Sequence, residues 1–404
     1  MDDTGIMTRL AAAAIRSIDD EGDEKVVMHK RASLNAGKLQ AQIDLAATLP
    51  GITVPATKLN PDPFRVAAPN AVIDLRNGRS LIPTPTDRIT QAVTPEHDPT
   101  ATCPLFQRFL TEILPDKDVR DFLQRALGYS LTGSVREEVI FLLVGRGANG
   151  KSTLVSTIRR IMGDYATTVS TSLLTGNYQS SHETSTLALQ GVRFAAASET
   201  DFGSHLAEAK IKSLVSSEAI TARGAYQKSA VTFDPSHKLW LSTNYLPNID
   251  GSDEGLARRL IVIDFPRTFS REERDPNLQE SLLLEGSGIL NWLIEGAILW
   301  QTHGLNPPQV LQDQADEYRD SMDTFGRFLE EAIEYGEEFR ASNAEVWEAF
   351  SRFQQSEPPP SRLGRKSFSQ AMLRRHRQEN RNGVRTWPHL RVRPIDLSEI
   401  MRNL

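Results

Sequence analysis

The stretch Gly145-Arg146-Gly147-Ala148-Asn149-Gly150-Lys151-Ser152-Thr153 decides the fold of this chain. An apolar run typical of a buried strand precedes it at residues 139–144, and a helical pattern follows over residues 151–162. Its glycines permit backbone conformations and close approaches that a side chain would forbid. A strand, a glycine-rich loop ending in Lys-Ser, and a helix together predict a loop whose N–H groups surround nucleotide phosphates.

The loop residues have different expected tasks. Lys151 reaches the β- and γ-phosphates of ATP, and the Ser152 hydroxyl is a ligand of Mg²⁺. The other expected contacts to the nucleotide come from Gly145, Gly147, Ala148, Asn149, Gly150 and Thr153. A glycine-rich turn that matches the pattern by chance is the alternative, and the flanking strand and helix disfavour it.

Composition limits the class of protein. The chain has 404 residues, of which 39% are hydrophobic and 24% charged, so it is long enough for two or three ordinary domains. No apolar run reaches the length of a membrane span and no signal peptide is apparent, so we expect a cytoplasmic protein without a membrane partner. The single Cys103 excludes an intramolecular disulfide and a multi-cysteine metal site.

Charge is distributed unevenly around a net value of −6. Residues 362–404 hold 11 basic side chains against three acidic ones. This excess indicates that the C-terminal region binds a polyanion, and a solvated basic face is the alternative.

Apolar strands at residues 192–197, 239–243 and 260–265 alternate with helices after the loop, which is typical of a parallel sheet in an α/β fold. The first 50 residues read as helical, and a proline-rich stretch follows them. From residue 325 the pattern predicts helices, a break at residues 358–360, another helix, and a strand pair at 384–387 and 390–394. Helices closed by a small hairpin are typical of a winged helix.

The expected organisation has three parts. Residues 1–98 form an N-terminal helical and mixed accessory region. Residues 99–305 form the ATPase, with a helical lead-in at 99–135, a P-loop core at 136–267 and a helical lid at 275–305. Residues 318–404 form a winged-helix-like domain.

Polar side chains follow the predicted strands on the chain. Glu199, with Asp201 as second choice, follows the strand at 192–197, where Mg²⁺ and an attacking water need a carboxylate. Asn244 follows the strand at 239–243 and is placed to orient that water. A helix cap and a turn former are the respective alternatives.

Paired arginines, Arg258 and Arg259, precede the last strand of the series. Such a pair can supply a cation to a γ-phosphate across a subunit interface. A surface salt bridge is the alternative.

These four elements, in this order, resemble the superfamily-3 helicases of the AAA+ class, and more narrowly the C-terminal helicase half of the phage/plasmid primase family. Flanking segments at residues 70–78, 122–133 and 288–293 carry the same resemblance, which covers residues 60–305. It implies that Glu199 is the Walker B acid and that Asn244 senses the γ-phosphate. It also implies that Arg259, with Arg258 as alternate, acts on the neighbouring subunit.

This superfamily places a DNA-contacting hairpin between the acidic strand and the sensor, and residues 219–233 fit it. The resemblance assigns DNA contacts to Arg223, Tyr226 and Lys228 at the tip and to Lys212 in the preceding motif, with an ordinary surface hairpin as the alternative. Where the family often has a Gly-Gly-Asp turn, this chain has Ser216-Ser217-Glu218.

The resemblance implies an ATP-driven DNA helicase that replicates a phage, plasmid or integrated element in a bacterial host. Subunits form a ring, expected to be a hexamer, on single-stranded or forked DNA. The chain begins too late to hold the primase domain of longer members, so a separate primase or polymerase is an expected partner. An ATP-switched initiator or loader, and a small-molecule kinase, are the alternatives.

Overall fold

The computed structural model describes most of the chain in two compact units. The described residues are 5–49, 51, 53–55, 58–175, 182–198, 206–224, 229–247, 249, 254–322, 324–356, 364–381 and 383–393. The first unit comprises residues 1–61 and 84–90, and the second comprises residues 62–83 and 91–404.

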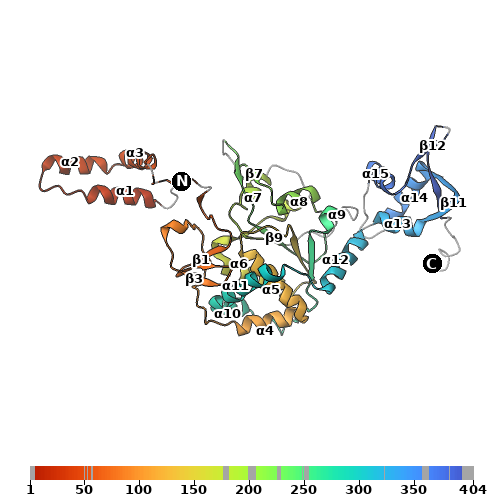
Figure 1. Ribbon diagram of the computed structural model, residues 1–404, viewed down its shortest axis with the longest axis horizontal. Helices are drawn as coiled ribbons and strands as arrows, with labels where there is room; N and C mark the ends of the chain where they lie inside the picture. The colour runs from red at the N-terminus through yellow and green to blue at the C-terminus, as the bar shows by residue number, and fades with distance from the viewer. Residues whose placement is uncertain are drawn as a thin grey trace. The chain divides into compact units, whose positions relative to one another are not determined.

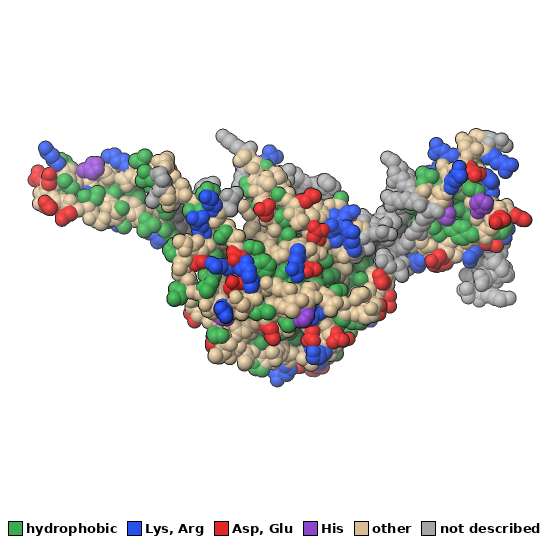
Figure 2. All heavy atoms as spheres, viewed as in Figure 1, with side chains coloured by type: hydrophobic (Ala, Val, Ile, Leu, Met, Phe, Trp, Pro, Cys, Tyr) green, Lys and Arg blue, Asp and Glu red, His purple; other side chains and the backbone are tan. Residues whose placement is uncertain are grey.

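The first unit is helical, as predicted (Figure 1). Its helices are α1 (Ile6–Arg16), α2 (Glu24–Ser33) and α3 (Ala36–Ala47). Asp23 and Asn35 cap the second and third helices through their side-chain oxygens. Ile15 and Leu39 are the buried hydrophobic side chains among the described residues of this unit, and Figure 2 shows other apolar side chains at its surface.

A five-stranded parallel sheet forms the centre of the second unit and confirms the predicted α/β core. The strands are β4 (Ile140–Val144), β5 (Ala166–Thr168), β6 (Phe194–Ser198), β9 (Lys238–Thr243) and β10 (Leu260–Asp264). Their order across the sheet is β10-β4-β9-β6-β5. The chain therefore crosses between non-adjacent strands, and β9 lies between β4 and β6. The short edge strand β5 was not predicted.

Helices cover both faces of this sheet because alternate side chains of each strand point to opposite faces (Figure 1). Phe141 and Leu143 of β4 pack in the cluster that contains α4, α5, α6, α10 and α11. Ile140 and Leu142 pack in the other, which contains α8 and Tyr318. These helices are α4 (Pro104–Ile113), α5 (Lys117–Leu131), α6 (Lys151–Met162), α7 (His182–Leu187), α8 (Glu208–Val215), α9 (Glu254–Ala257), α10 (Leu278–Leu284), α11 (Gly286–His303) and α12 (Gln309–Met322).

Helices α5 and α11 cross with their backbones in contact. A Cβ atom at Gly128 would lie 2.1 Å from the Ala297 nitrogen, and one at Gly296 would lie 2.2 Å from the Gln124 carbonyl oxygen. Both glycines are therefore required by packing between helices that hold one face of the sheet.

Replacing Gly128 with alanine should lower the free energy of unfolding by at least about 1–3 kcal/mol, because backbone atoms rather than a flexible side chain occupy the new methyl position. Urea denaturation measures this change. Gly364→Ala is the matched control, since a Cβ there meets nothing within 4 Å. Equal stability of the two variants would contradict the packing argument.

Two smaller antiparallel sheets accompany the core. One contains β1 (Arg65–Ala68), β2 (Ala71–Asp74) and β3 (Arg79–Leu81). The other is the hairpin of β7 (Ile220–Ala222) and β8 (Val231–Phe233), whose arms pair Ile220 with Phe233 and Ala222 with Val231. The predicted hairpin is thus confirmed in its arms.

The C-terminal part of the second unit has its own aromatic core around Phe328, Phe350 and Trp387. Its elements are α13 (Thr324–Ala332), β11 (Ile333–Ser342), α14 (Asn343–Ser356), α15 (Arg365–Arg375), β12 (Glu379–Arg381) and β13 (Val384–Val392), with sheet order β11-β13-β12. The strand pair predicted at 384–387 and 390–394 is wrong, because residues 384–392 form one strand. Pro388 lies at the point where the register with β11 shifts. A β-bulge is therefore present where the sequence pattern predicted a turn.

No single helix in the described part of the chain is long and apolar enough to cross a bilayer. Helices α10 and α11 reach that length and composition only when taken together, and they are bent by 74° where they meet.

Candidate nucleotide-binding site

The loop between β4 and α6 is shaped by two glycines in conformations that other residues rarely adopt. Gly145 has φ of 151° and Gly150 has φ of 85°. A Cβ at Gly145 would lie 2.6 Å from the Phe265 carbonyl oxygen, and one at Gly150 would lie 2.5 Å from a methyl carbon of Ile113. Side chains at either position would therefore displace the loop.

Lys151 is the first residue of α6 and is held by three oxygen atoms. Its Nζ donates to the Gly145 carbonyl at 2.6 Å, to Asn149 Oδ1 at 3.0 Å and to Asn244 Oδ1 at 3.5 Å. Asn244 follows β9, the neighbour of β4 in the sheet. The structure thus brings together Lys151, Asn149 and Asn244, which the sequence assigned to one site.

Burial changes the acidity of this lysine. The residue is 4% exposed, and desolvation lowers the pKa of Lys151 from 10.5 to about 8, although the nearby carboxylate of Asp264 opposes the shift. Asp264 is the last residue of β10, the other neighbour of β4, and its place beside the loop was not predicted. An anionic phosphate at Nζ would favour the charged form.

The affinity for ATP should therefore fall as the pH rises above about 8. A bound phosphate raises the pKa of Lys151, so above about pH 8 binding takes up a proton and affinity falls as pH rises. The stability of the nucleotide-free protein changes with pH in the opposite direction. The contribution of Lys151 to the free energy of unfolding rises between about pH 8 and 10.5, because the unfolded chain binds more protons there than the folded one. Calorimetry in two buffers of different ionisation enthalpy should detect proton uptake at pH 9 that is absent in Lys151→Met.

A cavity of about 510 Å³ adjoins the loop. Its lining includes Ala148, Gly150 and Thr153 from the loop and helix α6, Phe109 from α4, and Arg274 from the segment after β10. That segment is tied to the loop by the Phe269 N–H, which donates to the Ala148 carbonyl at 2.8 Å. Sequence reasoning did not identify Phe109 or Arg274, because only the fold brings their segments to the loop.

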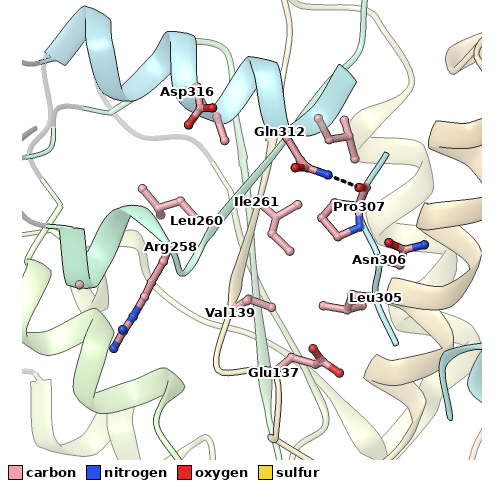
Figure 3. Close-up of a pocket in the computed structure, with 13 residues that line it drawn as sticks. Glu137, Val139, Arg258, Leu260, Ile261, Leu305, Asn306, Pro307, Gln312 and Asp316 are labelled. Carbon is pink, nitrogen blue, oxygen red and sulfur yellow. Dashed lines mark hydrogen bonds between the residues drawn. The ribbon is translucent and has the colours of Figure 1, made fainter. Parts of the chain in front are cut away.

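The two arginines before β10 have different environments. Arg259 is paired with Glu138 Oε2 at 2.9 Å, donates to the Gly255 carbonyl at 2.9 Å, and has a side chain that is 15% exposed. Arg258 is exposed and makes no ion pair with any residue that the structure describes. Figure 3 shows Arg258 at the edge of a cavity of about 840 Å³, directed away from Asn306 and Pro307.

The remaining site residues are placed unequally. Ser152 is exposed at the start of α6, and Thr153 is half-buried beside it. Lys212 is half-buried on α8, and Arg223 is exposed just after β7. Glu199, Asp201, Tyr226 and Lys228 lie outside the described residues.

Two family models match the chain. One described as "D5 N terminal like" matches residues 2–115, and one described as a family of unknown function matches residues 143–259. The second match contains the loop, Asn244 and both arginines.

Two similar curated proteins come from viruses. "Putative helicase L207/L206" of Acanthamoeba polyphaga mimivirus is 30% identical over 240 residues, which cover 55% of this chain and 25% of that protein. "Putative primase C962R" of African swine fever virus is 26% identical over 250 residues, with the same two shares. Among solved structures, the A form apo structure of the NrS-1 C-terminal region has a TM-score of 0.47 at 12% identity, covering 89% of this chain and 90% of that chain.

The fold and the site together define the class of this protein. It is a mixed α/β protein with a glycine-rich loop between a strand and a helix. The D5 match and the viral relatives confirm the predicted resemblance to superfamily-3 helicases of the primase family. The aligned part of this chain spans about a quarter of the length of each of these two viral relatives.

Proposed function

We propose that the chain is an ATP-dependent DNA helicase of the AAA+ class that replicates a viral, phage, plasmid or integrated element as a ring, with a hexamer as the expected form. The observation that carries this proposal is the convergence of Lys151, Asn149 and Asn244 at the carboxyl ends of β4 and β9. The sheet order supports the AAA+ assignment, because β9 with its sensor lies between the loop strand and β6, which leads to Glu199.

The loop residues fit a bound nucleotide. Asn149 Nδ2 is buried and has no hydrogen-bond partner among the described residues, so this donor is available to a phosphate oxygen. The cavity beside the loop has room for the nucleoside, and Phe109 supplies an apolar surface for a base. Mg²⁺ would be held by Ser152 and Glu199, and when bound it supplies positive charge against the charge that develops on the phosphates.

The arginine pair is placed to act on the nucleotide site of a neighbouring subunit and not on the nucleotide site of its own subunit. Arg259 precedes Leu260, which pairs with Ile140 at the start of β4, whereas the phosphate loop follows Val144 at the other end. Five residues of strand separate the two ends, about 16 Å. Arg258, the exposed member, is therefore our preferred arginine finger, and Arg259 holds the turn that presents it.

DNA contacts are assigned to two regions. The hairpin carries Arg223 just after its first arm, with Tyr226 and Lys228 in the predicted tip. The C-terminal elements follow the order helix, strand, helix, helix, strand, strand, which supports a winged helix, and their basic excess suits DNA.

Replacing Lys228 with alanine should weaken binding to single-stranded DNA and reduce the slope of log K against log salt by roughly 0.7, the value for one phosphate contact on a single strand. Fluorescence anisotropy across a salt series measures this slope. Lys38→Ala, on α3, should leave it unchanged. An unaltered slope in the Lys228 variant would remove the hairpin tip from the DNA interface.

Strand displacement on forked DNA, measured together with ATPase activity and particle mass, tests the whole proposal. We expect ATP-dependent displacement, turnover stimulated by DNA, and a ring-sized particle in the presence of nucleotide. Slow turnover without displacement at any protein concentration would favour the initiator or loader. Turnover indifferent to DNA but dependent on a small-molecule acceptor would favour the kinase.

A further inference from the structure

Glu138 lies where three segments of the ATPase region meet. It lies two residues before Ile140, where β4 begins. Its backbone has φ of 50°, a left-handed conformation that is uncommon for glutamate. Its Oε2 accepts from Arg259 Nη2 at 2.9 Å. Its Oε1 accepts from the Ser217 backbone N–H at 3.2 Å and from the Ser217 hydroxyl at 3.3 Å. One carboxylate thus joins the entry to β4 with two segments distant in sequence.

On one side of this carboxylate is the turn that presents Arg258. Arg259 holds that turn through its backbone as well as its side chain: its N–H donates to the Leu256 carbonyl at 2.8 Å, and its carbonyl accepts from the Ile140 N–H at 2.8 Å. The bond to Glu138 fixes the guanidinium that also contacts the Gly255 carbonyl. A displacement of Glu138 would therefore shift the turn and the exposed arginine on it.

On the other side is the base of the hairpin. Ser217 follows the C-cap of α8, Ser216, and lies three residues before Ile220, where β7 begins. This is the position where the chain has Ser216-Ser217-Glu218 in place of the family's glycine-rich turn. Both the backbone N–H and the hydroxyl of Ser217 are used in the contact, so its serine side chain adds a bond that glycine would lack.

The carboxylate is charged at neutral pH. Partial burial acts to raise the pKa of Glu138, but the hydrogen bonds from Ser217 and the charge of Arg259 outweigh it, and the pKa lies below its ordinary value. The ionic contact to Arg259 is therefore present at neutral pH.

We infer that Glu138 is a positioning residue that couples the DNA hairpin to the arginine turn, so that DNA held by the hairpin alters how Arg258 is presented to the neighbouring nucleotide. The inference rests on the proposed function, since it takes the hairpin as a DNA contact and the arginine as a finger. It adds the physical connection between them: a contiguous set of bonds that runs from Ser217 through Glu138 and Arg259 to Arg258.

Coupling between two ligands is measured as the ratio of DNA dissociation constants with and without a non-hydrolysable ATP analogue. In the wild-type protein we expect the analogue to change the affinity for a labelled single strand by about fivefold or more. In Glu138→Ala the ratio should approach one, while the variant still binds the analogue and the DNA when each is tested alone. Asp121→Ala, which removes a comparable but exposed partner of Lys117 on α5, should keep the wild-type ratio.

Melting temperatures establish that the variants fold. If Glu138→Ala does not fold, the comparison is made with Glu138→Gln, which keeps the side-chain shape and loses the charge. A wild-type ratio in a folded Glu138 variant would overturn the inference and leave the proposed function intact. A wild-type protein whose DNA affinity ignores the analogue and whose ATPase ignores DNA would overturn both.

Discussion

Replacing Lys151 with alanine is expected to reduce ATP turnover by at least about 10²–10³-fold, the cost of losing a preorganised donor at a developing charge. The structure supports a large effect because this ammonium group is buried among the Gly145 carbonyl, Asn149 and Asn244. Steady-state phosphate release with saturating Mg²⁺ and ATP measures it.

Two further variants separate chemistry from folding. Lys151→Met keeps most of the side-chain volume and should show the same loss, because it is the charge that contacts the phosphates. Lys117→Ala removes an exposed lysine on α5 and should retain full turnover. Wild-type turnover in Lys151→Ala would refute the assignment of the loop.

Replacing Arg258 with alanine is expected to reduce turnover by about 10³-fold, the lower end for an arginine finger, while the variant still binds nucleotide and keeps a melting temperature near the wild-type value. Arg258 is exposed and makes no ion pair with a described residue, so its removal disturbs little of the fold. Turnover, nucleotide binding and thermal unfolding are measured on the same preparation.

Arg259→Ala is the informative companion. It should lower both turnover and melting temperature, because it leaves Glu138 without its cation and Gly255 without a donor. Mixing Arg258→Ala with Lys151→Ala subunits should restore part of the activity, since one supplies an intact loop and the other an intact arginine. Loss of turnover confined to Arg259→Ala, with unchanged stability, would return the finger to Arg259, the residue that the family resemblance favours.

Much of the central fold could be predicted from local pattern. Strands β4, β6, β9 and β10 are apolar and buried on both faces, so each reads as a continuous hydrophobic run. By contrast, β5 has three residues, and β11 contains three glutamates and a glycine, residue types that are depleted in strands, so neither carries a strong strand pattern.

The site was predictable where it depends on strand ends. Lys151 and Asn244 meet because residues that follow parallel strands gather at one edge of a sheet, and that rule needs only the sequence. The ion pair of Arg259 with Glu138 and the electrostatic effect of Asp264 on Lys151 depend on β10 lying beside β4. Strand order is a tertiary property that no local pattern specifies, so the sequence offered a salt bridge of these arginines as an alternative but could not identify Glu138 as the partner of Arg259.

The separation of phosphate loop and arginine turn at opposite ends of β4 and β10 has a consequence for enzyme assays. Under the proposed function, an isolated subunit carries two half-sites and no complete one. Specific activity should therefore rise with protein concentration and fall on dilution below the assembly threshold. An open chain of subunits would leave one loop without an arginine, and closure of the ring would complete the last site.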